Sequence, residues 1–133
     1  MTRMKLVLWG LLGLLIVFGL GWAYGASGRR EVARQAEENA LRASLAEGRT
    51  HILEARVSLY NNNFGDASGE LEQARDALER VHQTYRDRSD EAAASSIGTA
   101  IERIGEAQKL ANKLDPTANA RAADALRALA VIR

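Results

Sequence analysis

The N-terminal stretch from Leu6 to Gly28 contains no charged residue, and it constrains the chain more than any other feature. Lys5 precedes the stretch, and Arg29 and Arg30 follow it. An α-helix needs about 20 apolar residues to cross a hydrocarbon core about 30 Å thick. The sequence therefore predicts an N-terminal transmembrane anchor over residues 1–28, and it makes the lipid bilayer the first predicted partner.

The ends of this stretch carry residue types that favour the membrane interface, where aromatic rings and basic side chains reach the headgroups. The predicted interface anchors are Trp9, Trp22, Tyr24, Arg29 and Arg30. Gly21 and Gly25 form a G-x-x-x-G pair, a spacing that lets another helix approach closely. These two glycines are therefore predicted to pack against a second helix within the membrane.

A cleavable signal peptide is the alternative interpretation of the same stretch. Signal peptides have apolar cores of about 7–15 residues and a cleavage site between small residues. The apolar run is longer here, and Trp22 and Tyr24 crowd the candidate cleavage sites. The length of the run therefore favours an uncleaved anchor.

The charges beside the stretch predict the orientation of the protein, a single-pass protein of the inner (cell) membrane. Arg3 and Lys5 precede the stretch, whereas four arginines follow it closely: Arg29, Arg30, Arg34 and Arg42. Because basic residues favour the cytoplasmic side, this count favours a cytoplasmic domain over a periplasmic one.

The composition of the whole chain excludes several function classes. Its 18 lysine and arginine residues are balanced by 17 acidic residues, so no basic surface for nucleic acid is expected. The absence of cysteine excludes disulfides and thiolate metal sites. No small-molecule substrate and no cofactor is predicted.

The chain after the anchor has the periodicity of α-helices only. A helical stalk is predicted over 29–48 and a helical bundle domain over 49–133. Leu45, Ile52 and Leu59 lie seven residues apart and predict a packed face on a helix that ends at the asparagines 61–63. The predicted fold class is thus all-α: a transmembrane helix followed by a small antiparallel bundle of about four helices.

Three further helices follow from apolar spacing and from capping residues. The second is expected to begin near Asp66 as its N-cap, with a 4-3 apolar pattern: Ala67, Leu71, Ala74, Leu78, Val81 and Tyr85. The third is expected to follow Ser89 or Asp90 and to bury an apolar face that extends to Leu114. The fourth is expected to use Asp115 as N-cap and Pro116 as its first residue.

Residues 50–80 resemble a tetratricopeptide-repeat hairpin. The positions that match, in order, are Ala55, Phe64, Ala67, Leu71 and Ala74. Glu54 departs from the family pattern, which has a large apolar residue there, and no proline follows Leu78. The resemblance implies a TPR-like interaction scaffold of the kind found in bacterial membrane-anchored adaptors, without chemistry of its own.

Residues suited to catalysis or metal binding are few. His51 has Glu54 three residues after it, and His82 has Glu79 three residues before it. A carboxylate-histidine metal site in a bundle needs two such motifs and further inward carboxylates, for which the alanine-rich seams leave no place. We therefore predict no metal site and no catalytic residue, and the protein is not expected to be an enzyme.

Tyr60, Phe64 and Tyr85 are the candidate partner-binding residues. Two interpretations are open: these aromatic residues complete the core of the hairpin, or they anchor a partner interface. The function predicted from the sequence is a non-catalytic, single-pass membrane scaffold or accessory subunit. It would bind other membrane protein subunits in a larger complex, for example a respiratory or photosynthetic one. The alternative is a membrane-tethered helical sensor or ligand-binding bundle.

Overall fold

The computed structural model describes the backbone of residues 2–132, and their side chains except at residues 2, 3, 5, 6 and 23–27. The described residues form four α-helices: α1 (Thr2–Tyr60), α2 (Phe64–Asp87), α3 (Glu91–Ala111) and α4 (Ala118–Leu129). This described part of the chain contains no β-strand. The contacts divide the chain into two compact units, Met1–Asn39 and Ala40–Arg133.

The expectation of a transmembrane helix at the N-terminus is wrong on this structure. Among the residues that the structure describes, no helix offers an apolar segment of the length that a bilayer crossing requires. The all-α class is confirmed, but its membrane-spanning element is not.

The described residues of the first unit, 2–39, all belong to α1. Its large apolar side chains are exposed, including Trp9, Phe18 and Trp22. Toward its end, the Glu31 carboxylate accepts hydrogen bonds from Arg34 at 3.1 Å and from Gln35 at 3.1 Å. The hydrogen bond from Arg34, the larger cause, and that from Gln35 lower the pKa of Glu31 below its ordinary value of 4.5.

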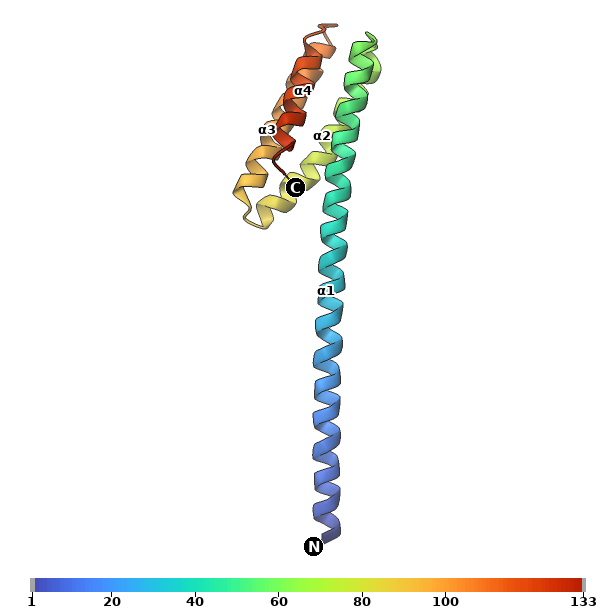
Figure 1. The fold of residues 1–133 in the computed structure, drawn as a ribbon, viewed down its shortest axis with the longest axis vertical. Helices are drawn as coiled ribbons and strands as arrows, with labels where there is room; N and C mark the ends of the chain where they lie inside the picture. Colours follow the sequence, from blue (N-terminus) through green and yellow to red (C-terminus); the bar gives the residue numbers. More distant parts are fainter. Residues whose placement is uncertain (1, 133) are drawn as a thin grey trace. The chain divides into compact units, whose positions relative to one another are not determined.

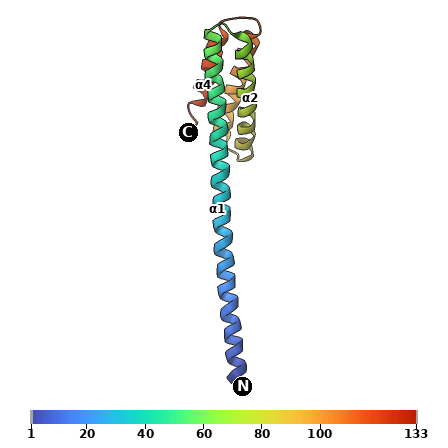
Figure 2. The ribbon, with the colours of Figure 1, turned by 90° about the vertical axis from the view of Figure 1, so that its right-hand side faces the viewer.

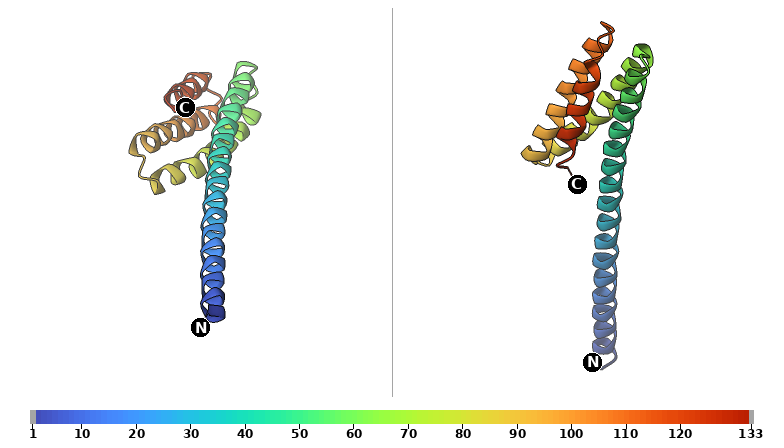
Figure 3. Two further views of the ribbon diagram at one scale, coloured as in Figure 1. Left: turned by 60° about the horizontal axis from the view of Figure 1, so that its bottom comes forward. Right: turned by 45° about the horizontal axis from the view of Figure 1, so that its top comes forward.

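The second unit, Ala40–Arg133, is a helical bundle, as predicted. It contains the C-terminal part of α1 and all of α2, α3 and α4, and successive helices run in opposite directions (Figures 1 and 2). Helix α3 packs against both α2 and α4, and Figure 3 shows α4 lying along α3. Short connections make such neighbours antiparallel.

The core of the second unit is built from alanine and branched aliphatic side chains. Among the described residues, no polar or charged residue is buried. The largest fully buried side chains are Ile52, Leu71, Leu78, Val81, Ile97, Ile104 and Leu129. The predicted packed face of α1 is confirmed, because Leu45, Ile52 and Leu59 are all buried in this core.

Gly48 lies in the packed face of α1 and faces Leu78 and Ala74 of α2. A Cβ atom added to Gly48 would lie 2.8 Å from Cδ2 of Leu78 and 3.6 Å from the carbonyl oxygen of Ala74. Carbon atoms at optimal contact are about 3.5–4.0 Å apart. The glycine therefore provides the space that the Leu78 side chain occupies.

The turns between the helices use the predicted residue types but not always the predicted position. Helix α2 begins at Phe64 with Asn63 as its N-cap, so the expected cap at Asp66 is wrong. The Asn63 side chain accepts a hydrogen bond from the backbone N–H of Asp66 and donates one to its carboxylate. Of the two predicted caps of α3, Ser89 and Asp90, the structure uses Asp90: its carboxylate accepts from the N–H of Ala93 at 3.1 Å.

The connection between α3 and α4 also departs from the prediction. Helix α3 ends at Ala111, and Leu114 is 68% exposed with a left-handed backbone, φ 57°. Helix α4 begins at Ala118 rather than at Pro116. The Asp115 carboxylate instead accepts from both the hydroxyl and the backbone N–H of Thr117, and these bonds lower the pKa of Asp115 below its ordinary value of 3.8.

Candidate functional site

The part of α1 within the second unit presents two opposite faces with different environments. One face, with Leu45, Ile52 and Leu59, lies in the core. The other face repeats the same 4-3 spacing but is exposed along its length. We call this exposed row the outer seam: Ala43, Ala46, Thr50, Leu53, Val57 and Tyr60.

The three large residues of the outer seam lie together at its C-terminal end. The exposed fractions are 50% for Leu53, 62% for Val57 and 81% for Tyr60. Because residues three and four apart share one helix face, these side chains form one continuous apolar strip. Such a strip on a helix that already has a packed face elsewhere is a candidate contact surface.

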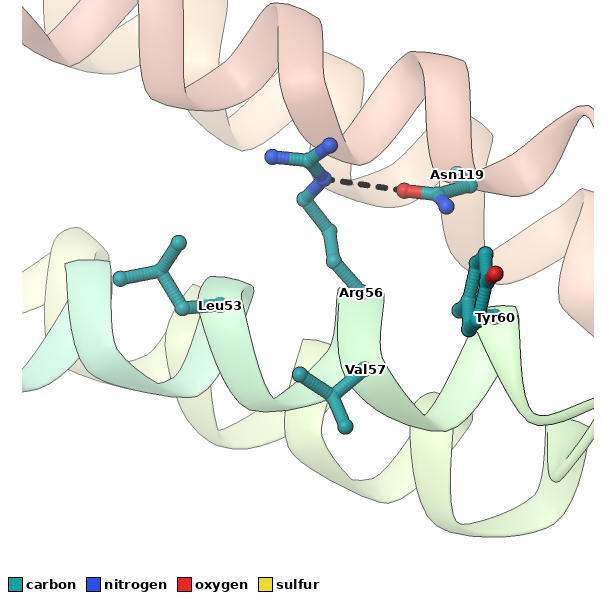
Figure 4. Close-up of a pocket in the computed structure, with 5 residues that line it drawn as sticks. All are labelled: Leu53, Arg56, Val57, Tyr60 and Asn119. Atoms are coloured by element: carbon teal, nitrogen blue, oxygen red, sulfur yellow. Dashed lines mark hydrogen bonds between the residues drawn. The ribbon is translucent and has the colours of Figure 1, made fainter.

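An open groove of about 310 Å³ runs beside this strip, between α1 and α4 (Figure 4). Its lining residues are Leu53, Arg56, Val57, Tyr60 and Asn119. Arg56 extends from α1 toward α4 and donates from Nε to the side-chain oxygen of Asn119 at 2.9 Å. This hydrogen bond supports the polar wall of an otherwise apolar groove.

Basic residues border the outer seam on the side of α4. Arg49 donates from Nη2 to the carbonyl oxygens of Leu129, at 2.7 Å, and Ile132, at 2.8 Å. Arg56 lies one heptad after Arg49 and makes the contact with Asn119 described above. Arg42 lies one heptad before Arg49 and is exposed.

Acidic residues border the outer seam on the side of α2. Glu47 lies 3.4 Å from Arg80 of α2. Glu54 lies 3.5 Å from Nδ1 of His51. The exposed fractions of these two carboxylate side chains are 51% and 57%, so both reach solvent beside the seam.

The aromatic residues predicted as partner-binding do not share one environment. Tyr60 is exposed and lines the groove, whereas Phe64 and Tyr85 are partly buried and pack against the core. The structure thus places one of the three at the outer seam. The interpretation of Phe64 and Tyr85 as residues of the hairpin core agrees with their packing.

His51 and two carboxylates form the one group in the described residues whose ligand atoms are close enough to hold a metal ion. Atoms of His51, Glu54 and Glu70 lie within 4.8 Å of one another. Nδ1 of His51 is 2.7 Å from an oxygen of Glu70, a hydrogen-bond distance. Glu70 lies on α2, 19 residues from His51 in sequence. The sequence pattern therefore indicated only the proximity of His51 to Glu54, three residues later. His82 lies elsewhere, against Gly98 of α3.

The residues predicted to act at a membrane lie in the first unit. Trp9 and Trp22 are 74% and 76% exposed, and Arg29 and Arg30 are exposed as well. No atom outside the local helix backbone lies within 4 Å of the position of a Cβ on Gly21. Tyr24 and Gly25 lie outside the residues whose side chains the structure describes. The interface role predicted for this group depended on the membrane-spanning helix, which the structure does not support.

Comparison of the chain with protein-family models, with curated proteins and with solved structures gives no match. The tetratricopeptide-like hairpin over 50–80 therefore stays a prediction. Apart from Tyr60, the residues of the outer seam were not predicted as a contact surface. Their 4-3 spacing can be recognised in the sequence, but the small side chains of Ala43 and Ala46 contribute little hydrophobicity to the pattern.

Proposed function

We propose that the bundle of residues 40–133 is a non-catalytic protein-interaction scaffold that docks a helix of a protein partner on the outer seam. One observation carries the proposal: Leu53, Val57 and Tyr60 are at least half exposed on a single helix face. Burial of a large apolar side chain contributes about 1.5–3 kcal/mol. A helix laid along this strip would bury all three.

The groove beside the strip supports recognition of a helix more than recognition of a small ligand. Pockets for small ligands enclose most of the ligand surface, but the three apolar residues that line this groove, Leu53, Val57 and Tyr60, are at least half exposed. An amphipathic helix needs a linear apolar track with polar borders. The outer seam, bordered by arginines and glutamates, has that form, which disfavours the sensor or ligand-binding alternative.

Site-specific photo-crosslinking in the full chain tests the proposal. A photoreactive phenylalanine derivative at position 57 is expected to form a protein adduct in cells that produce the protein. The same probe at position 102, an exposed site on α3, is the matched control and should form none. The adduct is identified by mass spectrometry.

A second variant shows whether the contact uses the apolar strip. With the probe at position 57, the substitution Leu53→Glu should reduce the adduct at least about tenfold, because it places a charge at the centre of the contact. Glu102→Gln with the same probe should change nothing. Absence of any adduct from positions 53, 57 and 60 would contradict the proposed function.

A further inference from the structure

We propose that the occupant of the outer seam is a second copy of this chain, and that the two α1 helices pair there as a parallel, two-stranded coiled coil. This inference rests on the proposed function, because it identifies the partner of the same face. It is carried by two features of α1: the heptad positions of the seam residues and the charges beside them.

The seam residues occupy the two core positions of a heptad repeat. Ala43, Thr50 and Val57 fall at position a, and Ala46, Leu53 and Tyr60 fall at position d. Parallel two-stranded coiled coils favour β-branched residues at a and leucine at d. Thr50, Val57 and Leu53 follow this preference in consecutive positions, and the alanines before them permit close helix approach.

The bordering charges determine the relative direction of the two helices. Arg42 and Arg49 occupy position g, and Glu47 and Glu54 occupy position e. In a parallel pair, each g residue faces the e residue five positions later on the other helix. Arg42 then faces Glu47 of the second copy, and Arg49 faces its Glu54. In an antiparallel pair, arginine would face arginine and glutamate would face glutamate.

The contacts of α1 with α2 and α4 of the same chain leave the outer seam uncovered, so a second copy can reach it. Helix α4 contacts the arginine border through Arg49 and Arg56. Helix α2 contacts the glutamate border through Glu47. The seam itself lies between these borders and is exposed. Both hydrogen bonds of Arg49 use Nη2, and a guanidinium has five N–H donors, so the other nitrogens can meet a carboxylate of the second copy.

Disulfide trapping tests the pairing directly, because the natural chain has no cysteine. Ala46→Cys and Tyr60→Cys, each made alone in the full chain, place a thiol at position d near one end of the seam. In a parallel pair, equivalent d residues face each other, so each variant should form a disulfide-linked dimer. Ala92→Cys, at an exposed site on α3, is the control and should remain unlinked.

A charge-exchange experiment tests the specificity of the pairing. Arg42→Glu alone and Glu47→Arg alone each place like charges opposite one another in a homodimer, and each should weaken the dimer about tenfold. An equimolar mixture of the two variants restores opposite charges at both contacts and should regain dimers, measured by light scattering. Failure of the mixture to regain them would overturn the parallel arrangement.

The adduct formed at position 57 separates failure of this inference from failure of the proposed function. An adduct between two copies of the 14.5 kDa chain supports both proposals. An adduct to a different protein, together with unlinked Ala46→Cys, overturns the second copy as occupant and retains the docking scaffold. Absence of any adduct overturns both.

Discussion

Arg49 of α1 and Leu129 of α4 are 80 residues apart in sequence, yet the guanidinium donates a 2.7 Å hydrogen bond to the Leu129 carbonyl oxygen. The same Nη2 also donates to Ile132 at 2.8 Å. Leu129 is the last residue of α4, where helix C=O groups lack partners within the helix, and Ile132 lies three residues beyond it. A cation there also interacts favourably with the helix dipole.

Replacement of Arg49 should therefore loosen the C-terminal end of α4. Arg49→Met is expected to lower the free energy of unfolding by about 1.5–3 kcal/mol, the usual range for hydrogen bonds to a charged group. Hydrogen exchange should become faster at residues 130–132. Arg127→Met is the control, because Arg127 is 76% exposed and pairs only with Asp124 in the contacts described; it should cost at most about 1 kcal/mol. Equal effects of the two substitutions would contradict the role of Arg49.

Gly48→Ala should destabilise the protein although alanine is the better helix former. The new methyl group would lie 2.8 Å from the fully buried Leu78 side chain. Overpacking of this kind costs about 1–3 kcal/mol, more than the gain of about 1 kcal/mol in helix propensity. Denaturant unfolding followed by circular dichroism measures the difference.

Gly69→Ala is the matched control for Gly48→Ala. Gly69 lies in α2, is exposed and has nothing within 4 Å of its Cβ position. The control should therefore stabilise the protein by about 0.5–1 kcal/mol. The double variant Gly48→Ala with Leu78→Ala should be less destabilised than the sum of the single effects, because both act on one contact. Strict additivity would mean that the two residues do not compete for space.

Leu114→Gly should stabilise the chain although it removes a large apolar side chain. Leu114 is 68% exposed and has a φ of 57°, a left-handed conformation that costs a residue with a Cβ about 1–2 kcal/mol. The gain in the folded state exceeds the greater entropy of glycine in the unfolded chain, so the net effect should be about 0.5 kcal/mol or more. A lowered melting temperature would show that Leu114 contributes contacts that its exposure does not indicate.

The carboxyl group of Asp115 should titrate below its ordinary value of 3.8, because two hydrogen bonds from Thr117 hold it in the charged form. Its contribution to stability is therefore fully present above pH about 4 and is lost as the pH falls through the lowered pKa. Thr117→Val removes the hydroxyl donor, the larger cause, and should raise the pKa toward 3.8. NMR titration of the side chain measures both values, and an unchanged pKa would contradict this cause.

Local sequence patterns predicted much of the bundle. The 4-3 pattern from Ala67 to Val81 identified the buried face of α2, and Asp90, the cap of α3, was one of the two residues predicted for that position. Asp66 was predicted as the cap of α2, but Asn63, which lies three positions earlier and is also a good capping residue, has that role. Leu114 was misplaced because apolar spacing does not reveal where a left-handed residue ends a helix.

Contacts between segments that are distant in sequence could not be predicted from the sequence alone. The pairing of His51 with Glu70 and that of Arg49 with the end of α4 both depend on how the helices pack. The outer seam was not predicted for a different reason: the packed face through Leu45 and Ile52 already accounted for the amphipathic pattern of α1. The prediction at the N-terminus rested on the uncharged run from Leu6 to Gly28, and among the described residues no helix qualifies as a membrane span.

The gap at Gly48 also fixes the axial register of α1 and α2. The core contacts of α2 repeat alanine and leucine, so a shift by one helical turn, about 5.4 Å, would preserve most of their chemistry. After such a shift, however, Leu78 would meet Leu45 or Ile52 instead of the glycine, and the two large side chains would compete for the same volume. The absence of a side chain at Gly48 therefore favours one axial alignment of α1 and α2 over the alternatives shifted by a turn.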